Sequence, residues 1–167
     1  MSVERLIIID GYNVIYASKS LKQWMPDNKE RAREKLFEYV KAIHSIESVR
    51  MVLVFDSSNE TLEVEYPFRD KSFECVFAPA SVTADGVIER LLVRAKDKAK
   101  DKDASFVTVV SNDNLVREAT RSNGALVIRP DDLFDWVALC DRRLMELSKK
   151  RTTEGEKPFG NRIDFEL

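Results

Sequence analysis

The sequence has little of what many catalytic sites are built from. Its 167 residues include one histidine, His44, and two cysteines, Cys75 and Cys140. One histidine removes most chemistry that depends on histidine, and we expect His44 to be a surface or partly packed helix residue. Both cysteines lie in apolar periodic segments, which predicts buried free thiols and argues against a disulfide or a zinc site.

Other absences exclude further classes of protein. The sequence has no run of 18 apolar residues, so we expect no transmembrane helix and no membrane partner. The start, MSVERLIII, lacks the features of a signal peptide, which favours a cytoplasmic location. GxGxxG and P-loop motifs are absent, which argues against a bound organic cofactor. A haloacid-dehalogenase phosphatase would need an aspartate two residues after Asp10, where this chain has Tyr12.

Composition predicts one globular domain. Hydrophobic residues make up 44% and charged residues 34% of the chain, which is ordinary for a soluble domain. The net charge of −2 neither indicates a nucleic-acid-binding protein nor excludes one. Carboxylates that hold metal ions make a chain acidic and still attract phosphates through the metal.

Apolar runs alternate with helical patterns along the chain. The runs predict strands over residues 5–9, 51–55, 73–77, 106–110 and 125–128. Helices are expected over residues 27–48, with Asp27 as cap, and over 83–100, 113–122 and 131–150. Residues 17–27 are expected to be irregular with a short helical turn, and 57–70 to form a polar loop or hairpin. This order predicts an α/β fold with a mainly parallel sheet of about five strands and helices on both faces. We expect residues 1–151 to form the domain and 152–167 an irregular extension.

Acidic residues follow several of the predicted strands. Asp10 follows LIII, Asp56 follows VLVF, and Asp113 comes shortly after VTVV. Asp85 falls in the first turn of the helix after the third strand, and Glu89 is four residues further on the same helix face. Each could alone be a turn residue or a helix cap. Because the carboxyl ends of parallel strands share one edge, we expect the four aspartates to form one cluster there.

A cluster of carboxylates predicts a bound cation. Like charges that are this close repel one another by several kcal/mol at an effective dielectric constant of about 20. Oxygen ligands suit Mg²⁺ or Mn²⁺, and such an ion polarises a phosphodiester and activates water. Asn13 and Ser111 could add neutral oxygen atoms nearby. The residues therefore favour metal-dependent phosphodiester hydrolysis.

Residues that could hold single-stranded RNA lie near the same edge. Tyr12 is the best candidate for stacking on a base. Cationic side chains are also expected to form a basic rim beside the acidic cleft, and the candidates are Lys19, Lys22, Arg117 and Arg121. Many of these cations could equally be solvated helix charges.

Several motifs together resemble those of a known family. They occur in order over nearly the whole chain as IDGYNVIY, LVFDSSN, TADGVIERL, VVSNDNLVRE, GALVIRPDDL and EKPFGNRI. In these motifs the chain resembles the NYN branch of the PIN-like nucleases, and within it the YacP-like bacterial ribonucleases.

The resemblance implies a three-layer PIN-like fold and metal-dependent endoribonuclease activity. It also implies a role in mRNA decay linked to translation, with the ribosome as a further partner. The catalytic residues that it implies are Asp10, Asn13, Asp56, Asp85 and Asp113. The metal would be held by Asp10, Asp85 and Asp113, with Asp56 and Glu89 as further candidate ligands. Gly11 would permit a tight turn, and Asn13 would hold the Asp10 carboxylate, a metal-bound water or the scissile phosphate.

The alternative is a non-catalytic RNA- or ribosome-binding module with the same fold. Degenerate members of that kind should lose the acids at the strand ends. This chain keeps them, which favours the enzyme.

Overall fold

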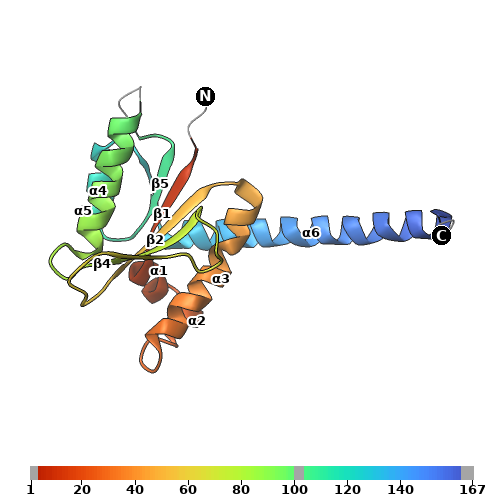
Figure 1. Ribbon diagram of the computed structural model, residues 1–167, viewed down its shortest axis with the longest axis horizontal. Coiled ribbons are helices and arrows are strands. Elements are labelled where there is room, and N and C mark those ends of the chain that lie inside the picture. The colour runs from red at the N-terminus through yellow and green to blue at the C-terminus, as the bar shows by residue number, and fades with distance from the viewer. Residues whose placement is uncertain (1–3, 100–103, 163–167) are drawn as a thin grey trace.

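A computed structural model describes residues 4–99 and 104–162 of the chain, with side chains described up to residue 152. Its six-stranded sheet has the order β3-β4-β2-β1-β5-β6 (Figure 1). The strands are β1 (Leu6–Asp10), β2 (Arg50–Asp56), β3 (Glu63–Glu65), β4 (Phe73–Ala78), β5 (Val107–Val110) and β6 (Leu126–Ile128). The helices are α1 (Gly11–Ala17), α2 (Lys19–Lys22), α3 (Lys29–Glu47), α4 (Thr83–Lys98), α5 (Asn114–Ser122) and α6 (Pro130–Arg162).

The sheet separates two hydrophobic cores. Strand β1 lies in its middle and is buried throughout, because Ile7 and Ile9 enter one core and Ile8 enters the other. The first core also takes side chains from α1, α3 and the start of α6, whereas the second takes them from α4 and α5. Figure 1 shows these two groups of helices on opposite sides of the sheet, and α6 continuing far beyond it. The predicted α/β fold with helices on both faces is confirmed.

One strand lies in the segment expected to be a polar loop or a hairpin, and one helix was not predicted. Strand β3 lies within residues 57–70 and pairs antiparallel with β4, whereas all other pairs are parallel. Its three residues, Glu-Val-Glu, are exposed and too few for their alternation to identify a strand. Helix α1 begins directly at Gly11 and has no side-chain cap, so no start signal precedes it. Helix α2 is the short helical element expected within residues 17–27.

Two predicted helix ends are wrong. Helix α3 is capped by Asn28, whose Oδ1 accepts a hydrogen bond of 2.9 Å from the N–H of Arg31, and not by Asp27. Helix α6 continues to Arg162, so residues 152–162 are not the irregular extension that was expected. Residues 163–167 lie outside the described part of the chain. The domain boundary at residue 151 stays a prediction.

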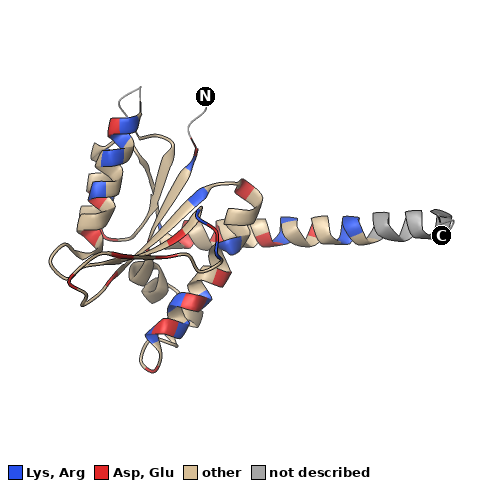
Figure 2. Cartoon of the chain, in the orientation of Figure 1, with Lys and Arg blue, Asp and Glu red and all other residues tan. Residues whose placement is uncertain are grey.

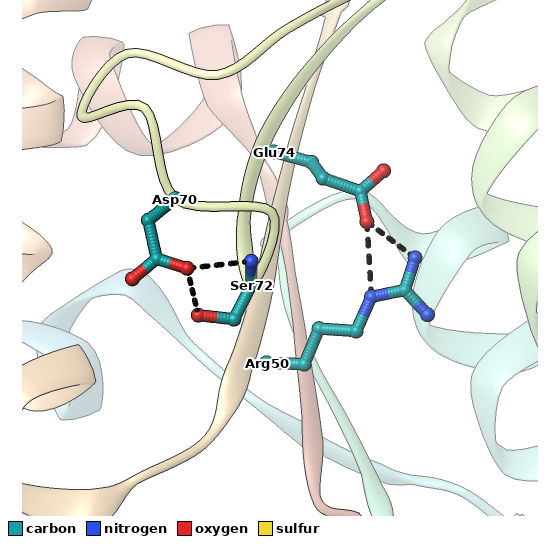
Figure 3. Close-up of polar contacts among 4 residues, drawn as sticks. All are labelled: Arg50, Asp70, Ser72 and Glu74. Atoms are coloured by element: carbon teal, nitrogen blue, oxygen red, sulfur yellow. Dashed lines mark hydrogen bonds and ion pairs between the residues drawn. The ribbon is translucent and has the colours of Figure 1, made fainter.

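Polar contacts fix the start of β4 at the edge of the sheet opposite the carboxyl ends (Figure 3). Arg50 on β2 donates from Nε to Glu74 Oε1 on β4 over 3.0 Å. Asp70 accepts hydrogen bonds from the backbone N–H and the hydroxyl of Ser72, at 2.8 and 2.6 Å. The His44 Nε2 and Ser72 Oγ atoms are 2.8 Å apart, so the one histidine is partly packed and holds this turn, as expected.

Two absences expected from the sequence can be checked in the described residues. Cys75 and Cys140 are buried free thiols, and burial raises the pKa of Cys75 to about 12. Among the helices that the structure describes, none is long and apolar enough to cross a membrane.

Candidate active site

The four aspartates singled out in the sequence lie at the carboxyl edge of the sheet. Asp10 is the last residue of β1, and Asp56 is the last residue of β2. Asp113 caps α5 just after β5, and Asp85 lies in the first turn of α4, which follows β4. Strands β1, β2, β4 and β5 are mutually parallel in the sheet, so all four positions share one edge.

The charges of the four aspartates act on one another. The pKa of Asp10 is raised to about 7, first because its side chain is buried and then because of the charges of Asp85, Asp56 and Asp113. The pKa of Asp85 is also raised, by partial burial and then by the charges of Asp113 and Asp56. Burial and the neighbouring charges therefore both favour the protonated form of Asp10. A nearby cation would relieve the repulsion and favour the ionised form.

Hydrogen bonds hold Asp10 and the turn after β5 in one network. Ser111 is fully buried, and its hydroxyl donates to Asp10 Oδ2 over 2.8 Å. Ser111 Oγ in turn accepts a hydrogen bond of 3.0 Å from the N–H of Asp113. Asn13 Oδ1 accepts the N–H of Asn112 at 2.8 Å and thereby ties α1 to this turn. The described polar partner of the Asp10 carboxylate is thus Ser111, and Asn13 supports the site through the backbone.

Asp56 and Asp113 also serve as helix caps. Asp56 Oδ1 accepts the N–H of Ala84 at 2.8 Å, at the start of α4. Asp113 Oδ1 accepts the N–H groups of Leu115 and Val116, at 2.9 and 3.1 Å. Both residues therefore have the structural role of helix cap that the sequence also allowed. Within the described contacts, however, each uses only Oδ1, and Oδ2 has no described hydrogen-bond partner.

Gly11 is required by close packing directly beside Asp10. A Cβ atom at this position would lie 2.2 Å from the ring of Phe55, which is fully buried in β2. Because that ring cannot move aside, any larger residue would displace the start of α1. The glycine thus sets how closely Asp10 approaches the end of β2.

Arg117 is not part of an exposed basic rim, which corrects the prediction. Its side chain is only 8% exposed, and Nη1 donates to the backbone oxygen of Ser111 over 3.1 Å. It therefore supports the turn that carries Ser111 and Asp113. Lys19 and Lys22 on α2 are exposed, so they are accessible to RNA, and their role stays a prediction.

The sequence reasoning missed three cations at this edge. Arg129 directly follows β6, and its Nη1 lies 3.4 Å from Asn112 Oδ1. Lys29 and Arg33 lie in the first two turns of α3 and both contact Tyr12. Arg129 could have been found from the sequence, because it directly follows a predicted strand. Lys29 and Arg33 could not, because no local sequence signal shows that α3 packs against Tyr12.

Glu89 stays a candidate metal ligand only because of its position on α4. It is exposed on α4, one turn after Asp85, and it borders a surface hollow of about 620 Å³ together with Gly86 and Arg90. Among the described contacts, none links Glu89 to the four aspartates.

The donor set of the site suits a hard divalent ion. All its charged groups are carboxylates, whose oxygen atoms Mg²⁺ and Mn²⁺ prefer. In the described part of the chain, no three His, Cys, Asp or Glu side chains are close enough to hold an ion directly. Mg²⁺ often binds one or two carboxylates and keeps several waters, so a pair of these aspartates is sufficient. The residues present therefore fit such an ion, and the ligand set stays a prediction.

Comparison with known proteins gives one consistent result. The family model for the YacP-like NYN domain matches residues 7–166. The chain is 28% identical over 155 residues to the uncharacterized protein YacP of Bacillus subtilis (strain 168), covering 93% of this chain and 86% of that protein.

Solved structures agree with this match. The crystal structure of Rae1 (YacP) from Bacillus subtilis is similar with a TM-score of 0.72 and 25% identity, covering 92% of this chain and 85% of that one. A tryptophan-to-leucine mutant of the same protein gives a TM-score of 0.73 and 25% identity, covering 90% and 85%. The NYN domain is a nuclease-type domain, and the chain belongs to the YacP-like NYN domain family.

Proposed function

We propose that this protein is a metal-dependent endoribonuclease that hydrolyses phosphodiester bonds of single-stranded RNA or mRNA. The observation that carries the proposal is the set of four mutually repelling aspartates at the carboxyl edge of a YacP-like NYN domain. Burial raises the pKa of Asp10 to about 7, and a cation bound beside it would favour the ionised form.

The proposed roles follow from how each side chain is held. The candidate ligands for Mg²⁺ or Mn²⁺ are Asp10, Asp85 and Asp113, with Asp56 and Glu89 as further candidates, and a pair of them would be sufficient to hold the ion. When bound, such an ion would polarise the phosphodiester and lower the pKa of a bound water. Ser111 orients the Asp10 carboxylate and favours its ionised form through the 2.8 Å hydrogen bond. Asn13 and Arg117 position the turn that carries Ser111 and Asp113.

The remaining features implied by the family resemblance belong to the same proposal. The enzyme would act in the cytoplasm, in mRNA decay linked to translation, with the ribosome as a further partner. Exposed cations at the carboxyl edge would hold the phosphates that flank the cleaved bond. Lys19, Lys22 and Arg129 are the accessible candidates, whereas Arg121 lies in the last turn of α5, toward the opposite edge of the sheet, which corrects the prediction for this residue.

The alternative function is an RNA- or ribosome-binding module without catalysis. It predicts RNA binding with no change in RNA length. We expect instead that the protein opens a circular single-stranded RNA in Mn²⁺ or Mg²⁺ and leaves it intact in EDTA. A circle has no ends, so its opening shows internal cleavage. Binding of the circle without opening, in either metal, would support the alternative.

A further inference from the structure

A second hollow lies beside the proposed site, on the side of β3 and β4. Its volume is about 360 Å³, within the range of small-molecule pockets. Asp56 lies at its border, so this hollow adjoins the carboxylate cluster. The lining of this hollow differs from that of the site, because it combines aromatic rings, cationic side chains and exposed glutamates.

Aromatic rings and one arginine form the wall of this hollow. Arg33 Nη1 donates to the Tyr12 hydroxyl over 3.0 Å, and its guanidinium carbon lies 5.1 Å from the ring centre of Phe77. The Tyr12 ring packs edge-on against the buried ring of Phe55, with centroids 4.9 Å apart. These contacts fix the position of Tyr12, which is half-buried and lines the hollow. A fixed aromatic wall of this kind suits a planar base.

Lys29 lies over the Tyr12 ring. Its Nζ atom lies 5.7 Å from the ring centre, and the side chain is exposed. A lysine on a flexible stem can leave the ring when a base arrives and remain close to the phosphate attached to it. The hollow therefore offers a ring and a cation for one nucleotide.

Two carboxylates supply hydrogen-bond acceptors in the same hollow. Glu63 and Glu65 are two residues apart on the edge strand β3, so their side chains share one face of the sheet. Glu63 lies directly opposite Phe77 in the antiparallel pair, and both glutamates line the hollow. Carboxylates repel phosphate groups, so the two glutamates suit the edge of a base that carries N–H groups.

We propose that this hollow binds the base of a nucleotide next to the cleaved bond and selects guanine. A carboxylate accepts two parallel hydrogen bonds, and guanine presents two adjacent donors, N1–H and the N2 amino group. Adenine and cytosine present one amino group beside an acceptor. Uracil presents one N–H group between two carbonyl oxygens, which a carboxylate repels. The proposal rests on the proposed function only in taking RNA as the ligand.

Binding of short RNAs without metal tests this selection directly. The probes are the dinucleotides GpU, IpU and UpU in EDTA, where I is inosine, which lacks the N2 amino group. The readout is the NMR shift of the backbone amides of Ser58, Asn59 and Glu63. We expect GpU to bind about tenfold more tightly than UpU, with IpU between them. Equal affinity for GpU and UpU, or for GpU and IpU, would overturn the proposal.

Variants of exposed glutamates show whether the carboxylates are responsible. The double variant Glu63→Gln, Glu65→Gln should bind GpU and UpU with less than about a twofold difference, since each amide also offers a donor. The matched control is Glu60→Gln, which alters an exposed glutamate outside the hollow and should keep the full preference. A preference that survives in the double variant would refute the assignment.

Cleavage separates this proposal from the proposed function. On an oligouridine strand with a single guanosine, the wild-type protein should cut at a fixed distance from that guanosine. Metal-dependent cleavage at positions unrelated to the guanosine would overturn the guanine subsite and leave the nuclease intact. GpU selection by a protein that cuts no RNA would leave the subsite standing and overturn the nuclease.

Discussion

The Ser111 hydroxyl donates a hydrogen bond to Asp10 Oδ2 at 2.8 Å, which joins the residue that follows β5 to the last residue of β1. Burial raises the pKa of Asp10, and this hydrogen bond to the carboxylate lowers it. One buried serine thus fixes both the position and the charge of the central carboxylate.

Ser111→Ala should therefore shift the pH dependence of RNA cleavage. Without the hydroxyl the pKa of Asp10 rises further, so at a low fixed Mn²⁺ concentration the activity should require a higher pH. We expect about a tenfold loss at pH 7, in kcat more than in KM, with partial recovery at pH 8.5. The control is Ser45→Ala, at an exposed position of α3. An unchanged pH profile in Ser111→Ala would contradict this role.

Asp10→Asn should change how the stability of the metal-free protein depends on pH. The folded pKa is about 7 and the usual value is 3.8, so folding takes up a proton between these values. The protonated Asp10 contributes its full stabilisation below pH 3.8. As the pH rises through 7 this contribution is lost, and the free energy of unfolding falls by up to about 4 kcal/mol. Asparagine does not ionise, so the variant should become more stable than wild type as the pH rises from 5 to 8.

Urea unfolding in EDTA at pH 5, 6, 7 and 8 measures this difference. Asp97→Asn is the matched control, because Asp97 is exposed near the end of α4, far along the helix from Asp85. If the free energy of unfolding depends on pH in the same way in Asp10→Asn and Asp97→Asn, the pKa of Asp10 is not raised by folding.

Divalent ions should stabilise the folded protein through the same carboxylates. At a Mg²⁺ or Mn²⁺ concentration of about 100 times Kd, the free energy of unfolding should rise by about 2.7 kcal/mol. Asp10→Asn and Asp85→Asn should lose most of this gain, and Asp97→Asn should keep it. Thermal unfolding with a metal titration measures the effect, and an equal gain in all variants would place the ion elsewhere.

Arg117 and the exposed cations should give different signatures in RNA binding. Lys22→Ala and Arg129→Ala should each reduce the slope of log affinity against log salt by about 0.7, as expected for one phosphate contact. Arg117→Ala should leave the slope unchanged and cost about 2 kcal/mol of stability, because the Ser111 carbonyl loses its partner. The measurement is binding of single-stranded RNA in EDTA over a salt series. A reduced slope in Arg117→Ala would mean that this buried side chain reaches RNA.

The sequence was sufficient to predict the positions of the four aspartates. Each follows a strand or begins a helix, and the topology of a parallel sheet brings such positions to one edge. Burial of β1 on both faces was also predictable, since LIII has no alternation. Strand β3 was not, because its three residues are exposed and pair only at the edge of the sheet.

Side-chain partners at the site needed the structure. Arg117 reads as a surface cation, and nothing in its neighbours shows that its guanidinium is buried against the Ser111 carbonyl. Tyr12 and Arg33 are bonded across 21 positions, a contact that depends on how α3 packs beside α1. Asn13 was expected at the carboxylate or phosphate, but its described partner is the backbone of Asn112. Local patterns carry no information on such tertiary contacts.

Cleavage of a single-stranded RNA by wild type, Asp10→Asn and Asp97→Asn under single-turnover conditions tests the central claim most directly. In Mn²⁺, we predict that Asp97→Asn cuts at the wild-type rate. Asp10→Asn should be slower by about a thousandfold, because it loses several kcal/mol of metal-dependent stabilisation. EDTA should abolish cleavage by all three. Cleavage by Asp10→Asn at the wild-type rate, or wild-type cleavage that persists in EDTA, would contradict the account.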